Sequence, residues 1–310
     1  NLMAKLACGI ADDMLTTTLL ATKAPILLAP AMNTGMWTAE ATQANLRTLQ
    51  ARGVHFVGPE SGFLACGDTG AGRMSEPAQI VEAAEKLLHP RRDLEGLRVL
   101  VTAGPTMERI DPVRYLTNDS SGKMGYAIAA AAQARGASVT LVSGPVHLTA
   151  PAGVSVVPVM STQNLYDAMM THCASQDVII QAAAPADYRP AVMAPEKLKK
   201  QDGQPFVLTL VENPDVAKAV GEQKKPGQIL VGFAAETEHL LENAQKKLDK
   251  KHLDMIVAND VTQAGAGFGV DTNIVTLISH QGMKSLPLLS KTEVADRILD
   301  QVAVLRAQTH

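Results

Sequence analysis

The sequence has few aromatic residues, little excess charge and no long apolar run. Phenylalanine, tyrosine and tryptophan make up only 3% of the 310 residues, which argues against a nucleic-acid platform built from stacked rings. The formal net charge is −3, so no strong basic field attracts a polyanion. No apolar run reaches the length of a membrane-spanning helix. We therefore expect neither a nucleic-acid partner nor insertion in a membrane.

Cysteine is also scarce, and its three occurrences lack the close spacing of a metal site. Cys8, Cys66 and Cys173 form an odd set, and no signal peptide is recognisable, which together predict a reducing, cytoplasmic location. The chain begins with Asn1 and its opening is typical of the middle of a domain, so we expect a piece of a longer protein. An apolar content of 46% with 19% charged residues fits an ordinary globular protein of two domains.

Short apolar segments alternate with longer helical ones, which predicts an α/β fold with a parallel sheet covered on both faces. The polar, proline-containing stretch after the helix at 76–88 predicts a linker at 91–96, between domains at 1–90 and 97–310. Strands at 273–279 and 285–289, joined by a turn at Gln281-Gly282, predict a β-hairpin, and residues 291–307 predict a closing helix. The other expected strands cover 24–30, 54–57, 98–102, 138–143, 154–159, 177–183, 228–234 and 254–258. The other expected helices cover 38–52, 126–135, 161–175 and 240–252. A further helix is expected to start at Asn213-Pro-Asp215, with the proline in its first turn.

Two features of the first domain are candidates for a site. Asn33 follows the apolar strand at 24–30, at the edge where open α/β sheets bind ligands, although asparagine there is more often a turn residue or helix cap. Residues 58–73 have no periodicity and predict a glycine-rich loop that contains Cys66. Glycines around a thiol predict a flap or a backbone that approaches a ligand closely. A purely structural role for Cys66 is the alternative. Ser75 is expected to cap the next helix.

The most informative stretch of the second domain runs from residue 97 to 125. An apolar strand breaks at Ala103-Gly104-Pro105, a polar loop follows, and Ser120-Ser121-Gly122-Lys123 precede an alanine-rich helix. Free N–H groups, hydroxyls and a lysine at a helix start suit a phosphate, but a plain helix cap accounts for them equally well. Neither GxxxxGK[ST] nor GxGxxG is present, so the stretch is neither a Walker A loop nor a dinucleotide fingerprint.

Lysines of the second domain gather in two places. Lys197 lies in a short lysine-rich run, and Lys247 and Lys251 share one face of the helix expected at 240–252. Like charges four residues apart repel each other, so a bound anion would relieve the repulsion. Both groups are therefore either solvated surfaces or clamps for a polyphosphate.

Several motifs occur in a fixed order along the chain. They are Pro30-Ala-Met-Asn33, Ala65-Cys-Gly-Asp68, Thr102-Ala-Gly-Pro-Thr106, Asp111-Pro-Val-Arg-Tyr115, Asn118-Asp-Ser-Ser-Gly-Lys123, Ala186-Asp-Tyr-Arg189, Pro195-Glu-Lys197 and Gly232-Phe-Ala-Ala-Glu-Thr237. Together they resemble the bacterial bifunctional flavoproteins of coenzyme A biosynthesis, which join a phosphopantothenoylcysteine decarboxylase to a phosphopantothenate–cysteine ligase. The resemblance implies part of a flavodoxin-like decarboxylase domain at 1–90 and a Rossmann-like, doubly wound ligase domain at 97–310.

For the first domain, the resemblance implies FMN and a decarboxylation. In that family FMN oxidises the substrate's cysteine moiety, carbon dioxide leaves, and the enethiol is then reduced and protonated. Asn33 would hold the substrate carboxylate, and Cys66 would donate the proton from a flap. The family's active-site histidine and first flavin-binding strands would precede Asn1, so the resemblance implies impaired decarboxylation and weak FMN binding for this chain.

For the second domain, the resemblance implies ligation of cysteine to 4′-phosphopantothenate through an acyl-CMP formed with CTP. Lys197 would neutralise charge during attack on the α-phosphate, and Arg114 and Asn118 would be needed for catalysis, with Asn118 holding the intermediate. Mg²⁺ would accompany CTP, with Asp187 as its ligand. The implied CTP contacts are Gln181, Ala182, Ala183, Asp187, Lys197, Pro214, Asp215, Val216, Ala217, Phe233, Lys247 and Lys251. A homo-oligomer with dimeric ligase domains is also implied.

Two other functions compete with this interpretation. One is an NAD(P)-binding reductase on a Rossmann-type sheet, and the missing glycine fingerprint weighs against it. The other is a non-catalytic, flavoprotein-like binding subunit, and the presence of Arg114, Asn118 and Lys197 weighs against that.

Overall fold

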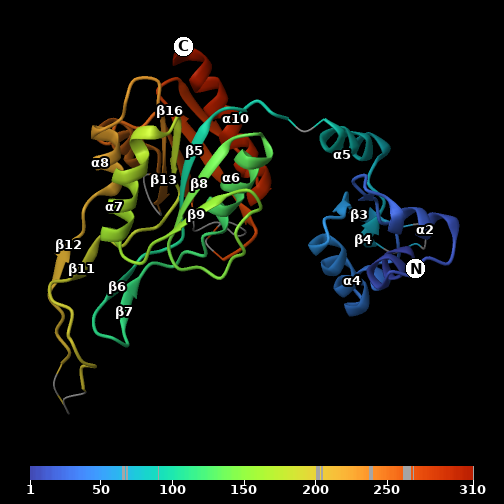
Figure 1. The fold of residues 1–310 in the computed structure, drawn as a ribbon, viewed down its shortest axis with the longest axis horizontal. Helices are drawn as coiled ribbons and strands as arrows, with labels where there is room; N and C mark the ends of the chain where they lie inside the picture. The colour runs from blue at the N-terminus through green and yellow to red at the C-terminus, as the bar shows by residue number, and fades with distance from the viewer. Residues whose placement is uncertain are drawn as a thin grey trace. The chain divides into compact units, whose positions relative to one another are not determined.

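The chain forms two compact units, Asn1–Arg91 and Arg92–His310 (Figure 1). The structure is a computed structural model, and it describes residues 1–64, 67, 69–89, 91–199, 203, 205–236, 240–260, 267 and 269–309. Among the helices of these residues, none combines the length and the apolar character that a bilayer crossing requires.

The first unit combines helices with two small sheets. Its helices are α1 (Leu2–Cys8), α2 (Met14–Ala21), α3 (Thr34–Thr38), α4 (Glu40–Ala51) and α5 (Pro77–Leu88). Strands β1 (Leu27–Leu28) and β2 (His55–Phe56) pair in parallel, and β3 (Glu60–Phe63) and β4 (Thr69–Arg73) form an antiparallel hairpin. The strand expected at 24–30 does belong to a parallel sheet, as expected. It is, however, only two half-buried residues long.

Two expectations for the first unit are wrong. The segment 58–73 contains the β3–β4 hairpin rather than an irregular loop. Gly62 and Gly70 pair across this hairpin, and because glycine has no side chain they conceal the alternation that marks a strand. Glu76, rather than Ser75, caps α5, and the Ser75 hydroxyl donates instead to a carboxylate of β3.

The second unit is built on an eight-stranded sheet in the order β17-β16-β14-β13-β10-β5-β8-β9. These strands are β5 (Arg98–Ala103), β8 (Ser138–Ser143), β9 (Ser155–Pro158), β10 (Val178–Gln181), β13 (Ile229–Glu236), β14 (Met255–Asp260), β16 (Val275–Ser279) and β17 (Gly282–Ser285). From β14 to β9 all strands run parallel, while β16 and β17 form an antiparallel hairpin at one edge. The expected α/β class, with a parallel sheet and a hairpin, is confirmed, but the second hairpin strand expected at 285–289 lies at Gly282–Ser285.

Helices cover both faces of this sheet (Figure 1). One face carries α6 (Lys123–Ala134) and α10 (Lys291–Thr309), and the other carries α7 (Thr162–His172), α8 (Val216–Glu222) and α9 (Leu240–Lys250). Alternate residues of β5 serve the two faces, since Val99 packs with the first pair of helices and Leu100 with the other three. Such strands are apolar on both sides, which is why the sequence predicted them well.

Two short hairpin arms extend beyond the carboxyl ends of the strands (Figure 1). One arm pairs β6 (Met107–Arg109) with β7 (Tyr115–Thr117), and the other pairs β11 (Tyr188–Pro190) with β12 (Leu210–Glu212). The remaining elements are β15 (Thr272–Asn273), β18 (Leu289–Ser290) and a 3₁₀ turn at Cys173–Ser175. The polar loop expected after β5 is therefore partly the β6–β7 arm.

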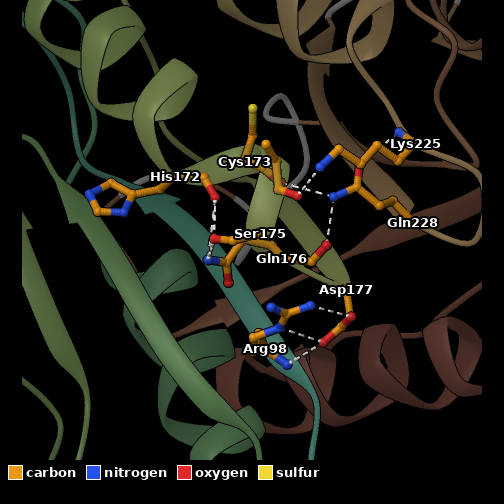
Figure 2. A network of polar contacts seen from close by, with 9 residues as sticks. Arg98, His172, Cys173, Ser175, Gln176, Asp177, Lys225 and Gln228 are labelled. Carbon is orange, nitrogen blue, oxygen red and sulfur yellow. Dashed lines mark hydrogen bonds and ion pairs between the residues drawn. The ribbon is translucent and has the colours of Figure 1, made fainter.

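A polar network joins the amino ends of β5, β10 and β13, at the end of these strands away from the two arms (Figure 2). The Arg98 guanidinium makes two hydrogen bonds to the Asp177 carboxylate, which also accepts the Arg98 backbone N–H at 2.8 Å. Gln228 donates to the carbonyls of Cys173 and Gln176 at 2.9 and 2.6 Å. These bonds tie together the starts of three strands, so they contribute to stability.

We expect Asp177→Asn to lower the melting temperature by about 2 °C at pH 7, a small effect because the pair with Arg98 is partly exposed. The hydrogen bonds from Arg98 lower the pKa of Asp177 and outweigh its desolvation. A carboxylate with a lowered folded-state pKa stabilises the fold above its unfolded pKa of about 4, and this contribution is lost as the pH falls through the folded-state pKa. The melting temperatures of Asp177→Asn and of the unaltered chain are measured as the pH is lowered through this range. A difference between them that stays constant on acidification would contradict the prediction.

Candidate active site

A pocket of about 420 Å³ opens at the carboxyl ends of β5, β10 and β13. Thr102, Gln181 and Gly232 line it, one from each of these strands. The chain order reverses between β5 and β10, because α6 leads from β5 to β8 on one side and α7 returns the chain to β10 on the other. Ligands of open α/β sheets bind at such a switch point.

Most of the CTP contacts that the family implies line this pocket. They are Gln181, Ala183, Asp187, Pro214, Asp215, Val216, Ala217, Phe233, Lys247 and Lys251. Ala182 does not line it, because side chains alternate at the end of β10 and Ala182 packs against the core under α6 and α10. Lys197 does not line it either, and lies exposed in the segment between β11 and β12.

Gln181 brings a buried donor to the pocket. Its Nε2 atom is shielded from solvent and has no hydrogen-bond partner within the described part of the chain. The side chain lies on the face of β10 that Ile179 also occupies, under α7 and α8. A buried N–H group without a partner costs free energy, so a ligand with an acceptor atom at this point would be favoured.

The loop that carries Asp187 is fixed from behind by hydroxyl and amide groups. The Thr106 hydroxyl lies 2.8 Å from the Thr162 hydroxyl and accepts the Ala186 N–H at 2.9 Å. Asn213 donates its side-chain amide to the Ala186 carbonyl and its backbone N–H to the Asp187 carbonyl, both at 2.8 Å. These hydrogen bonds hold Asp187 at the pocket, as is typical of a preorganised site.

Asp215 and Lys251 form an ion pair at the pocket, with 2.9 Å between the Lys251 Nζ and the carboxylate. Asp215 also caps α8 by accepting the Lys218 N–H at 3.0 Å. Burial raises the pKa of Asp215, but hydrogen bonds from Lys218 and Lys251 outweigh it, and the pKa is lowered overall. Pro214 precedes this cap, so the expectation that it lies within the first helical turn is wrong.

Asn118 lies at the rim of the pocket. Its side-chain amide donates to the carbonyls of Ala184 and Pro185 at 3.3 and 3.0 Å, and Pro185 is a lining residue. The helix α6 begins close by in sequence, and Gly122 caps it with a φ of 74° and no side-chain hydrogen bond. The plain-cap interpretation of Ser120-Ser121-Gly122 agrees with this, with the glycine as the cap residue.

Arg114 does not reach the pocket lining, and its partners lie on the arms. It makes two hydrogen bonds to Asp111 at 2.9 and 2.5 Å and donates to the Leu198 carbonyl at 2.8 Å. These guanidinium bonds hold the pKa of Asp111 far below its usual range, although burial opposes the shift. Asp111 was not singled out by the sequence, and its place within the Asp-Pro-Val-Arg motif is the one signal that pointed to it.

Comparison with known proteins identifies the family. The sequence model described as the DNA/pantothenate metabolism flavoprotein C-terminal domain matches residues 94–305, and the flavoprotein model matches residues 1–89. The coenzyme A biosynthesis bifunctional protein CoaBC of Vibrio vulnificus is 48% identical over 306 residues, which are 98% of this chain and 76% of that protein. The chain belongs to this family. The same-named protein of Bacillus subtilis is 50% identical over 313 residues, 100% of this chain and 77% of that protein.

Solved structures agree with this family membership. The crystal structure of the C-terminal domain of a coenzyme A biosynthesis bifunctional protein CoaBC is 45% identical with a TM-score of 0.60, and the match covers 70% of this chain and 99% of that one. The DNA/pantothenate metabolism flavoprotein from Streptococcus pneumoniae is 25% identical with a TM-score of 0.58, over 67% of this chain and 99% of that one. The resemblance seen in the sequence motifs is thereby confirmed.

In the flavoprotein unit of this family member, the structure places one of the two expected site residues. Asn33 caps α3, and its side-chain oxygen accepts the Gly35 N–H at 2.7 Å. Gly72 of β4 lies against the preceding residue, because a Cβ there would come within 2.1 Å of the Met32 carbonyl oxygen. The helix-cap role of Asn33 is thus confirmed, and its contact with a substrate stays a prediction. Cys66 lies outside the described residues.

Proposed function

We propose that the second unit ligates cysteine to 4′-phosphopantothenate with CTP, as a step of coenzyme A biosynthesis. The observation that carries this proposal is the pocket at the switch point, where residues implied for CTP arrive from separate elements of the sheet. Lys247 comes from α9 and Lys251 from the turn directly after it, Asp187 follows β10, and Val216 opens α8. The relatives carry the name coenzyme A biosynthesis bifunctional protein, which supports the same pathway.

In the proposed reaction a carboxylate oxygen of 4′-phosphopantothenate attacks the α-phosphorus of CTP, and pyrophosphate leaves. The amine of cysteine then attacks the acyl carbon, loses a proton, and displaces CMP. Lys247 and Lys251 bind the triphosphate, and Gln181 donates its unpartnered N–H to the nucleotide. Lys197 stabilises the charge that develops at the α-phosphate, and Asn118 donates to the acyl-CMP from the rim. Lys197 does not line the pocket, so its contact with the α-phosphate is proposed from the family motif alone.

We also propose Mg²⁺ as the metal that accompanies CTP. No group of three His, Cys, Asp or Glu side chains suited to a metal occurs in the described ranges. Mg²⁺ usually takes one or two protein carboxylates and completes its shell with water and phosphate oxygens, so the carboxylate of Asp187 at the pocket fits it. When bound, Mg²⁺ offsets the negative charge of the phosphates.

For the first unit we propose the family's FMN-dependent decarboxylation of 4′-phosphopantothenoylcysteine, with Asn33 and Cys66 as its site residues. The match to the flavoprotein model over residues 1–89 supports this assignment. The parallel sheet in the described part of this unit is the short β1–β2 pair, which does not by itself account for binding of an FMN ring.

We further propose that the second unit forms homodimers through its arms. Between β11 and β12, the side chains of Val192 and Val207 are 79% and 81% exposed, and Met193 and Phe206 are exposed as well. Apolar side chains gathered on one projecting segment are typical of a surface that a second copy covers.

The ligase proposal is tested by pyrophosphate release from CTP. Release that depends on 4′-phosphopantothenate, followed by formation of 4′-phosphopantothenoylcysteine when cysteine is added, would support it. The product is identified by mass spectrometry. Release that is independent of 4′-phosphopantothenate, or no release, would contradict it, and oxidation of NADPH in its place would favour the reductase.

We expect Lys251→Met to weaken CTP binding about tenfold, because a charged contact to the triphosphate contributes roughly 1.5 kcal/mol. Lys218→Met is the matched control, since Lys218 lies on α8 beside Glu222 and does not line the pocket. Isothermal titration calorimetry with CTP gives both dissociation constants. An equal loss in the two variants would show that general positive charge, rather than the pocket, attracts CTP.

A further inference from the structure

One buried carboxylate connects the two stretches that carry Arg114 and Lys197. Asp111 is completely buried, with an exposed fraction of 0%. Its Oδ1 accepts the backbone N–H groups of Val113 and Arg114, both at 2.8 Å. Its Oδ2 accepts the Arg114 guanidinium and, at 3.2 Å, the backbone N–H of Leu198, the residue after Lys197. Both oxygens of Asp111 are therefore engaged in holding these stretches together.

Further contacts hold the same two stretches together, before and after Lys197. The Arg114 guanidinium donates to the Leu198 carbonyl at 2.8 Å and lies over the Phe206 ring, 5.5 Å from its centre. On the other side of the lysine, the Ala194 N–H donates to the Ile110 carbonyl at 2.9 Å. The turn at 110–114 thus anchors the segment between β11 and β12 before and after Lys197.

We propose that Asp111 is a positioning residue of the ligase site, which fixes the Arg114 guanidinium and the segment bearing Lys197 relative to each other. The proposal rests on the proposed function, in which both cations act on anionic substrates. Asp111 does not line the pocket and is fully buried, so it acts through the groups it holds. The buried carboxylate pairs with the Arg114 guanidinium and accepts the N–H of the residue after Lys197, so its loss frees both groups. A displacement of about 1 Å in such a group can cost up to 100-fold in rate.

Asp111→Asn is the test, because it keeps the shape of the side chain and removes its charge and one acceptor oxygen. Turnover at saturating substrates is expected to fall about tenfold, with the CTP dissociation constant unchanged within about twofold. The double variant Asp111→Asn/Arg114→Gln is expected to lose less turnover than the product of the two single losses, because part of the effect of Asp111 passes through that arginine. Asp177→Asn is the matched control, since Asp177 makes the same kind of bidentate pair with Arg98 at the opposite edge of the sheet, and its turnover is expected to be normal.

Limited trypsin digestion gives a readout that needs no activity. Cleavage after Lys197 or Lys199 is expected to be several times faster in Asp111→Asn than in the unaltered chain or in Asp177→Asn, because the Leu198 anchor is lost. If the unaltered chain lacks ligase activity, the proposed function fails and the cleavage rates still decide whether Asp111 positions this segment. Should Asp111→Asn not fold, Leu198→Pro removes the same anchor from the other side and replaces it in both measurements, with cleavage followed after Lys199 alone because trypsin does not cleave a Lys–Pro bond.

Three results would overturn the proposal. The first is an unchanged cleavage rate, which means that Asp111 does not hold the segment. The second is a fully multiplied loss of turnover in the double variant, which means that no part of the effect of Asp111 passes through Arg114. The third is an equal loss of turnover in Asp177→Asn, which would make the effect a general loss of stability.

Discussion

Lys197→Gln is expected to slow pyrophosphate release on the order of 100-fold while leaving the second unit folded. The variant loses one positive charge that stabilises the α-phosphate in the transition state, an effect of about 3 kcal/mol. Lys197 is exposed in the segment between β11 and β12 and takes no part in the core, so its replacement leaves packing untouched. The loss should therefore appear in turnover and not in the melting temperature.

Lys199→Gln is the matched control for this prediction. Lys199 lies two residues further along the same exposed segment, and the family motif does not assign it a role. Single-turnover measurements with radiolabelled CTP would follow acyl-CMP formation in both variants. Near-normal formation in Lys197→Gln would remove Lys197 from the site, and an equal loss in both variants would reduce its role to the overall charge of the segment.

The sheet of the second unit could be predicted from the sequence because its strands are buried on both faces. Such strands are continuous apolar runs, and the expected strand at 138–143 coincides with β8. Local signals also located two helix starts to within about two residues, since Ser161 and Asp215, both within the expected starts, cap α7 and α8 through their own side chains. Information of this kind lies within a few residues of the feature it predicts.

The connections of the site could not be predicted, because they depend on residues far apart in sequence. Asp111 lies in a polar stretch that is typical of an exposed loop, and charged residues are rarely fully buried unless they are paired. Its partner Leu198 lies 87 positions further along the chain. Likewise Lys251 meets Asp215 across 36 positions, so nothing local to the lysine shows that it already has a carboxylate partner.

The position of Asn118 leads to the second large expected effect, that of Asn118→Asp. The amide donates to the carbonyls of Ala184 and Pro185 at the pocket rim, and a carboxylate cannot donate to either. In the proposed reaction the same N–H group donates to an oxygen of the acyl-CMP. The variant would therefore place a negative charge against an anionic intermediate, and loss of one such donor costs on the order of 100-fold in turnover.

The affinity for CTP should change little in Asn118→Asp, because the neutral amide contributes no charge to attract a triphosphate, whereas Lys247 and Lys251 do. Calorimetric titration with CTP and pyrophosphate release, measured on one preparation, separate the two effects. Asn164→Asp is the control, since Asn164 lies in the first turn of α7 away from the pocket lining, and it should leave both quantities unchanged. If CTP affinity in Asn118→Asp falls by as much as turnover, Asn118 binds the nucleotide, and the step it serves is the first rather than the second.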